Sequence, residues 1–209
     1  MEVKILNYKD FTDPNYWIGG FYELSIEFHP FGDNNRLNQA LIALRNLGFF
    51  TGYWQEQQDF ESDPISLPIN NDEGSVNQFY GILSSPDGNT LPCLISVIRI
   101  DGESDWIDIS IPQASLELFY PYKYPLTKDL NSWLVKIDEL FIRIAETIYN
   151  YSSFELAMIG EEVSGCTNQD KINLKDLEKI TYILPIRLQK RLEIHEKGEE
   201  LTNQLRLFC

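Results

Sequence analysis

The stretch Asn131–Gly165 reads NSWLVKIDELFIRIAETIYNYSSFELAMIGEEVSG, and the rest of the fold is expected to assemble on it. Its first half places apolar residues at helical spacing: Trp133, Ile137, Leu140, Phe141, Ile144 and Ile148. A single apolar stripe of this kind predicts a long amphipathic helix. The pattern breaks at residues 151–153, and residues 154–159 (FELAMI) are predicted to form a strand that leads into Glu161 and Glu162.

A similar order of elements occurs near the start of the chain. Residues 21–28 (FYELSIEF) alternate apolar and polar side chains, which predicts a half-buried strand with one wet or functional face. Asp33 or Asn34 can cap a following helix with leucines at 37, 41, 44 and 47, and residues 49–54 (FFTGYW) have strand composition. Gly19 and Gly20, ahead of the first strand, allow a bend or a close backbone approach.

Between these two β-α-β units the sequence predicts a hairpin. Residues 79–83 and 91–100 flank the turn signal SPDGN at 85–89, and residues 106–111 (WIDISI) alternate as a further strand. The fold class expected is α+β: a two-layer, mostly antiparallel sheet with helices on one face, built from ferredoxin-like duplicated β-α-β units.

The composition shifts after Cys166. We therefore expect a single α+β domain over residues 1–166, followed by a charged, helical C-terminal tail over residues 167–209. Within that tail, helix is expected over residues 174–182 and again over residues 186–204, where Lys, Arg and Glu mix with spaced leucines.

The charge balance narrows the classes of partner. The chain of 209 residues has 17 Lys+Arg against 32 Asp+Glu, a net charge of −15. Such a chain repels nucleic acid and anionic membranes, so neither is an expected partner, whereas a basic protein is. The alternative interpretation is that the charge only keeps a cytoplasmic protein soluble. Three cysteines without zinc spacing, no membrane-length apolar run and no evident signal peptide predict a cytoplasmic location.

Carboxylates and large aromatic residues provide the candidate binding site. The carboxylates could converge on a cation or supply a general acid, or they could simply form the solvated face of a one-sided sheet. The aromatic residues suit an interface with a basic partner, or else form a core with tyrosines at its rim. The binding residues proposed from the sequence are Glu23, Glu27, Trp54, Asp105, Trp106, Asp108, Glu161 and Glu162.

No catalytic constellation, metal ligand set or cofactor motif is apparent. His29 and His195 lack the neighbours of a triad, and Cys93 lies in an apolar run typical of a core thiol. Cys166, in a loop, is the better candidate for a reactive thiol. Gly160 and Gly165 bracket a backbone bend rather than a phosphate-binding loop.

Several short motifs, taken together, resemble those of an uncharacterised family of bacterial proteins. They are GGFYEL at 19–24, PC at 92–93, DW at 105–106 and IGEEVSG at 159–165. The resemblance covers residues 16–166 and implies no activity and no catalytic residue. In composition, small acidic proteins of this kind also resemble immunity proteins that neutralise toxins.

The sequence thus favours a non-enzymatic cytoplasmic binding protein that holds a protein partner, with an immunity-type inhibitor as one form of it. The first alternative is an enzyme with a carboxylate site, metal-dependent or not, around Glu23, Asp108 and Glu161. The second alternative is a structural subunit of a homo-oligomer.

Overall fold

The computed structural model describes residues 8–173, 175, 177, 180–195, 198–202 and 204–209. Two short 3-10 turns come first: η1 (Tyr8–Thr12) and η2 (Pro14–Trp17). The helices are α1 (Asn34–Arg45), α2 (Gln113–Phe119), α3 (Leu134–Tyr151) and α4 (Ile186–Arg191). The strands are β1 (Phe21–Phe28), β2 (Phe50–Trp54), β3 (Val76–Ser84), β4 (Thr90–Arg99), β5 (Asp105–Pro112), β6 (Leu156–Glu161), β7 (Thr181–Pro185), β8 (Glu199–Glu200) and β9 (Leu205–Phe208).

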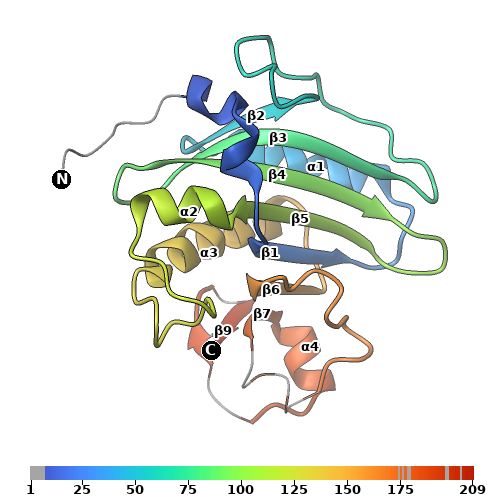
Figure 1. Ribbon diagram of the computed structural model, residues 1–209. Coiled ribbons are helices and arrows are strands. Elements are labelled where there is room, and N and C mark those ends of the chain that lie inside the picture. Colours follow the sequence, from blue (N-terminus) through green and yellow to red (C-terminus); the bar gives the residue numbers. More distant parts are fainter. Residues whose placement is uncertain (1–7, 174, 176, 178–179, 196–197, 203) are drawn as a thin grey trace.

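Within the described residues, all strands belong to one nine-stranded sheet in the order β2-β3-β4-β5-β1-β6-β7-β9-β8. Every neighbouring pair is antiparallel. Helices α1 and α3 lie against one face of this sheet, while η1 and η2 cross the other (Figure 1). The α+β class and the antiparallel sheet are therefore confirmed.

The ferredoxin-like duplication is not confirmed. Strands β5 and β6 both pair antiparallel with β1 and flank it, so the connection through α2 and α3 forms a split β-α-β unit. The first unit differs, because β2 lies at the far edge with three strands between it and β1. Helix α1 instead packs beside α3 under the sheet.

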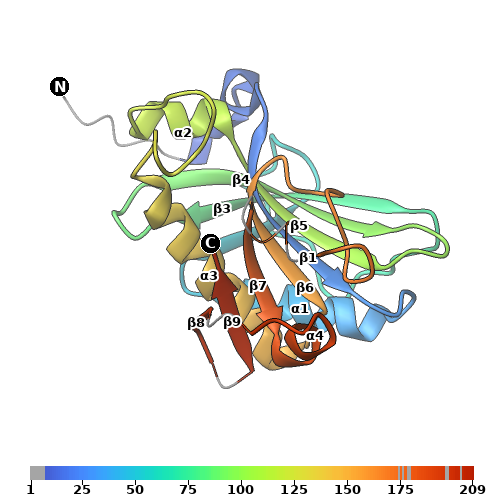
Figure 2. The same ribbon diagram turned by 90° about the horizontal axis from the view of Figure 1, so that it is seen from below.

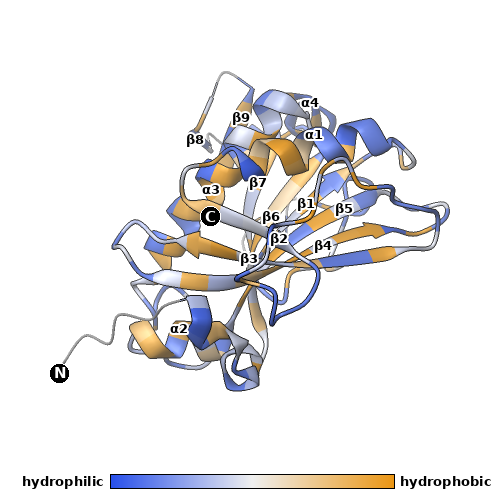
Figure 3. Cartoon of the chain, turned by 90° about the horizontal axis from the view of Figure 1, so that it is seen from above, coloured by the Kyte–Doolittle hydropathy of each residue, from blue (hydrophilic) through white to orange (hydrophobic). Residues whose placement is uncertain are grey.

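The expected helix stripe explains the main core. Side chains from both long helices and the inward face of the central strands form one cluster, which includes Leu41, Phe141, Ile144 and Ile109, all fully buried. Helix α1 begins as predicted, because Asp33 Oδ1 accepts a hydrogen bond from the Arg36 N–H at 3.0 Å. Apolar and polar residues alternate along residues 107–111 of β5, with isoleucines on the core face and Asp108 and Ser110 on the other, whereas β4 is apolar over most of its length (Figure 3).

The opposite sheet face is covered at both ends rather than exposed. At one end Phe11, Trp54 and Phe60 form a small aromatic cluster. At the other end a second apolar cluster joins β6 and β7 to α4 and the segment after β6: Leu156, Met158, Val163, Ile172, Leu177, Tyr182, Leu184, Leu188 and Phe208. Helix α4 therefore lies on the face opposite α1 and α3, so the helices are not confined to one face.

The region after residue 166 differs from the helical tail expected. Strand β7 pairs with β6, and β9 pairs with β7, so the chain extends the same sheet (Figure 2). Residues 174, 176, 178 and 179 of the predicted helix 174–182 lie outside the described residues, and its last two residues, Thr181 and Tyr182, belong to strand β7. Within the predicted helix 186–204, the described residues form the α-helix α4 over Ile186–Arg191, which begins directly after Pro185 ends β7.

The two edges of the sheet are both short. Strand β2 has five residues, and its register shifts between Gly52 and Trp54. Strand β8 has two residues, both glutamates. Among the described residues, no helix is long and apolar enough to cross a membrane.

Candidate functional site

The sheet face turned away from α1 and α3 has a row of buried polar side chains at its centre. Glu23, Ser25 and Glu27 alternate along β1, with exposed fractions of 6%, 0% and 0%. Asp108 and Ser110 lie beside them on β5, exposed by 3% and 4%. The alternation correctly predicted which residues share this face. The interpretation of the face as solvated is wrong, because the segment 162–170 covers it.

Ser164 joins two of these carboxylates. Its backbone N–H donates to Glu23 Oε2 at 3.1 Å, and its hydroxyl donates to Asp108 Oδ2 at 2.7 Å. The other two carboxylate oxygens accept from serines, Glu23 Oε1 from Ser110 at 3.0 Å and Asp108 Oδ1 from Ser25 at 2.6 Å. Each of the four oxygens thus has a donor. We call these five residues the carboxylate–serine network.

Glu27 holds the far end of the same covering segment. Its Oε2 accepts from the Gln169 backbone N–H at 2.7 Å, and its Oε1 accepts from the Ser104 hydroxyl at 2.6 Å. Ser104 Oγ also lies 3.4 Å from His29 Nδ1. The segment 162–170 is therefore fastened to the sheet at both ends by buried carboxylates.

Burial raises the pKa of Glu23, Glu27 and Asp108, because the charged form is desolvated. For Glu23, the negative charges of Asp108 and Glu162 raise the pKa further, while the Ser164 and Ser110 donors lower it. Within the described part of the chain, none of the three forms an ion pair. Among the described residues, their hydrogen-bond partners are serine hydroxyls and backbone N–H groups.

Two of the residues proposed for binding are buried in structural contacts. Asp105 is 1% exposed, and its two oxygens accept from Arg99 Nε and Nη2, both at 2.8 Å. The Trp54 ring packs against Phe60, with centroids 5.0 Å apart, and its indole N–H donates to the Ser62 carbonyl at 2.9 Å. Neither residue belongs to an exposed surface.

Trp106 is the proposed aromatic residue that remains partly accessible. It lines a pocket of about 350 Å³ between β4, β5 and the covering segment. Ile98, Ile100, Glu103 and Ser104 form one side of this pocket, and residues 164–168 with Lys171 form the other. We call it the Trp106 pocket.

Next to the Trp106 pocket, which Glu103 lines, three loops carry exposed carboxylates. One of these loops is the β4–β5 turn, at one end of the sheet (Figure 1). Arg99 lies within reach of the charges of Asp33 and Asp72, and Glu73 forms a hydrogen bond with Asp101. That hydrogen bond, with the negative charge of Asp101, raises the pKa of Glu73. We call this set the acidic end: Asp33, Asp72, Glu73, Asp101 and Glu103, all exposed.

Hydrogen bonds from buried Arg99 hold the loops of the acidic end together. Arg99 Nη1 donates to Asn34 Oδ1 at 2.8 Å and also to the Asn71 carbonyl, so one buried guanidinium joins the three loops. Apolar side chains lie on the same loops and strand ends, with Phe31, Val76 and Ile100 exposed by 38%, 56% and 48%. The acidic end is thus a mixed acidic and apolar surface.

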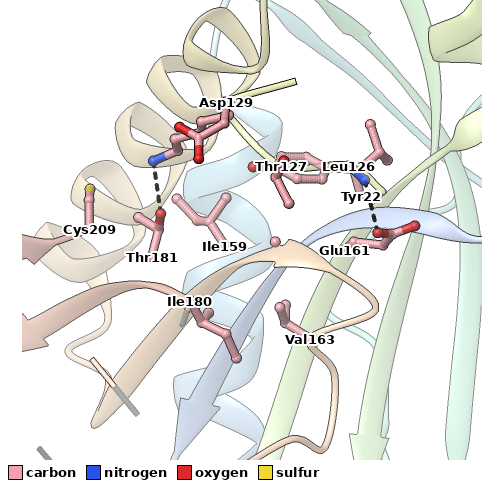
Figure 4. Close-up of a pocket in the computed structure, with 12 residues that line it drawn as sticks. Tyr22, Leu126, Thr127, Asp129, Ile159, Glu161, Val163, Ile180, Thr181 and Cys209 are labelled. Atoms are coloured by element: carbon pink, nitrogen blue, oxygen red, sulfur yellow. Dashed lines mark hydrogen bonds between the residues drawn. The ribbon is translucent and has the colours of Figure 1, made fainter. Parts of the chain in front are cut away.

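Glu161 and Glu162, at the end of β6, point in different directions. Glu162 is exposed, and its Oε1 accepts from the Phe21 backbone N–H at 2.7 Å. This contact needs a glycine at position 20, because a Cβ there would lie 2.5 Å from Glu162 Oε1. Glu161 lies on the other sheet face and lines a pocket of about 370 Å³ with Tyr22, Lys128 and Thr181 (Figure 4). We call it the Glu161 pocket.

The carboxylates of the enzyme alternative are not gathered in one pocket. Glu23 and Asp108 meet at Ser164 on one sheet face, whereas Glu161 has the same orientation as Ile159, a residue of the helix-side core. Among the described residues, no group of three or more His, Cys, Asp and Glu could hold a metal ion. Cys93 is fully buried, as expected, and Cys166 is exposed.

No protein-family model, curated protein or solved structure matches this chain. Its function is therefore inferred from the geometry of these sites alone.

Several residues of these sites were not identified from the sequence. Arg99, Lys128 and Ser164 each join segments that are far apart in the chain, and no local pattern indicates such partners. The acidic end had a partial signal, since Asp72-Glu73 and Asp101 with Glu103 both fall in turn sequences. Only the topology places these two turns beside the start of α1.

Proposed function

We propose that this protein binds a basic protein partner in the cytoplasm, and that the acidic end is the contact surface. The observation that carries the proposal is the close pair Glu73–Asp101 at the surface: the pKa of Glu73 is raised, because protonated Glu73 can form a hydrogen bond with Asp101 and because two ionised carboxylates so close together repel each other. Such an arrangement is unfavourable in isolation, and a cationic side chain placed between the carboxylates relieves it. The surrounding carboxylates would steer the partner toward this surface.

Exposed apolar residues at the same end supply the contact area that charge alone does not. Phe31, Val76 and Ile100 are each more than a third exposed. The Trp106 pocket is continuous with them through Ile100 and Glu103. An arginine of the partner would fit there, with its guanidinium stacked on the Trp106 ring and near Glu103. A basic toxin would be one such partner, which corresponds to the immunity-type role.

The test compares two variants with the same change in charge. The acidic-end variant contains Asp72→Asn, Glu73→Gln, Asp101→Asn and Glu103→Gln, and leaves Asp33 to cap α1. The control variant neutralises four exposed carboxylates elsewhere: Glu56→Gln, Asp63→Asn, Glu117→Gln and Glu139→Gln. Both raise the net charge from −15 to −11, so nonspecific attraction of basic proteins weakens equally.

The measurement is affinity capture from the source cell, with the bound proteins quantified at low and high salt. We expect one defined basic partner that the wild type and the control variant retain, that the acidic-end variant loses, and that salt releases. Titration of that purified partner should then show a slower association rate for the acidic-end variant. Equal capture by the two variants, or no salt-sensitive partner at all, would overturn the proposal.

A further inference from the structure

The Glu161 pocket lies on the helix side of the sheet, away from the acidic end. The ends of β6 and β7 form one wall, and the segment Leu126–Asp129 ahead of α3 forms the other. Its volume of about 370 Å³ is in the range of pockets for small molecules. Figure 4 shows Thr181 and Glu161 at opposite sides of this pocket, with Ile159 between them.

The Thr181 side of the pocket has a fixed positive charge. Lys128 Nζ lies 2.7 Å from Asp138 Oδ2 and donates to Thr181 Oγ1 at 2.9 Å. The Tyr22 hydroxyl donates to the other oxygen of Asp138 at 2.6 Å, which holds that carboxylate in place. Burial lowers the pKa of Lys128, but Asp138 outweighs burial and the pKa is raised, so the ammonium remains charged at neutral pH.

Donors remain on this side for an anionic group. An ammonium has three N–H donors, and Lys128 uses one for Thr181 while it forms an ion pair with Asp138. Because Thr181 Oγ1 accepts from Lys128, its own hydroxyl hydrogen is directed elsewhere. Cys209 also lies near Lys128, but a thiol is a weak acceptor that a carboxylate would displace.

The other side of the pocket has a fixed negative charge. Glu161 Oε1 accepts from Gln113 Nε2 at 2.7 Å, and Oε2 accepts from the Leu126 backbone N–H at 3.2 Å. Gln113 is itself held by the Tyr122 hydroxyl, which donates to its Oε1 at 3.1 Å. Each oxygen of Glu161 keeps a second lone pair, so the carboxylate is oriented but not saturated.

We propose that the Glu161 pocket binds a small zwitterion of the α-amino acid class. The ligand's ammonium group contacts Glu161, its carboxylate contacts Lys128 and Thr181, and its side chain lies against Ile159 and Leu126. A simple anion would be repelled by Glu161 and Asp129. A simple amine would leave the Lys128 donors unmatched. Only a molecule with both charges satisfies both sides.

The test is equilibrium dialysis of the full chain against the twenty amino acids as defined pools, with each binding pool then resolved. Two probes serve as controls: an alkyl diamine, which lacks the carboxylate, and a short dicarboxylate, which lacks the amine. We expect one or a few amino acids to bind and neither control to do so. Removing one charged contact should weaken binding about ten-fold or more.

The variants are Glu161→Gln and Lys128→Met, each expected to reduce binding. Because Lys128→Met leaves Asp138 without its cation and could impair folding, Thr181→Val provides a third variant that keeps both charges. Matched controls are Glu162→Gln and Lys136→Met, a lysine that pairs with exposed Asp87 outside the pocket. The proposal is overturned if no amino acid binds, if a control probe binds equally, or if folded pocket variants bind like the wild type.

This outcome is separate from that of the proposed function. The acidic-end variant should retain amino acid binding, and the pocket variants should retain the protein partner.

Discussion

Replacing Arg99 by methionine tests whether one buried guanidinium holds the acidic end together. Arg99 is 4% exposed and makes a two-pronged contact with Asp105, at 2.8 Å for each prong. It also donates hydrogen bonds to Asn34 and Asn71. Arg99 therefore connects the β4–β5 turn, the start of α1 and the segment before β3. Methionine preserves most of the apolar stem and removes every donor.

The expected loss follows from the burial of the partner. The Asp105 side chain is buried in the intact protein, at 1% exposed, and among the described residues the Gly32 N–H, at 3.0 Å, is the donor that remains to its carboxylate once Arg99 is removed. Removing one member of a buried ion pair costs about 3–5 kcal/mol of the free energy of unfolding. The double variant Arg99→Met/Asp105→Asn has no unpaired buried charge, and the side-chain oxygen of the introduced asparagine can still accept from the Gly32 N–H. Its free energy of unfolding should therefore be about 2 kcal/mol higher than that of Arg99→Met.

The assay is equilibrium unfolding in urea, followed by circular dichroism, with Arg45→Met as a control. Arg45 is an exposed arginine at the end of α1, and its removal should change stability by less than about 0.5 kcal/mol. The reasoning fails if Arg99→Met costs less than about 1 kcal/mol, as for a surface pair. It also fails if the double variant is as unstable as the single one.

Three further predictions concern the covered sheet face. The pKa values of Glu23, Glu27 and Asp108 are raised in the folded state, so the folded state binds more protons than the unfolded state. Their contribution to the free energy of unfolding is therefore fully present below the unfolded-state pKa, and it is lost as the pH rises through the folded-state pKa. Asp108→Asn, whose partners are serine hydroxyls that can donate or accept, should therefore stabilise at neutral pH and flatten urea midpoints plotted against pH; an unchanged slope contradicts this. Ser164→Ala removes a donor to buried Asp108, and we expect faster hydrogen exchange in residues 162–170 but not in α3; equal rates argue against the fastening role. Deleting residues 167–209 removes six members of the second apolar cluster, worth roughly 1.5–3 kcal/mol each, more than a typical domain can lose. A truncated chain with native circular dichroism would instead support residues 1–166 as an independent domain.

The elements with strong local periodicity were predicted from the sequence. Strand β1, helix α1 and helix α3 have a clear period, and the β3–β4 hairpin has a strong turn signal at residues 85–89. Their side chains determine their own secondary structure over at least eight residues. The apolar stripe of α3 is buried throughout, as its spacing indicated.

The strands after residue 166 were not predictable in the same way. Strand β7 has five residues and β9 has four, too short for a period to stand out among charged neighbours. Their stability comes from pairing with β6 and from the second apolar cluster, neither of which a local pattern reports. The tertiary context decided their structure.

The candidate site could be predicted from the sequence only in part. Alternation placed Glu23, Glu27 and Asp108 on one face, and it could not show whether another layer covers that face. The covering segment is irregular in conformation and is positioned by single contacts, such as Ser164 to Asp108 and Gln169 to Glu27. Contacts of this kind depend on the whole topology, so they have no signature in the sequence.

The shape of the two outer strands has a consequence for how copies of this chain can meet. At one edge, a strand from another molecule would have to pair with β2, which has five residues and a shift in register. At the other edge it would have to pair with β8, which has two residues, both negatively charged. Each side therefore presents few free backbone groups in a regular row, and one of them repels its own copy. Edge-to-edge strand pairing between molecules is therefore disfavoured at both edges, so copies of this chain would associate through side-chain contacts instead.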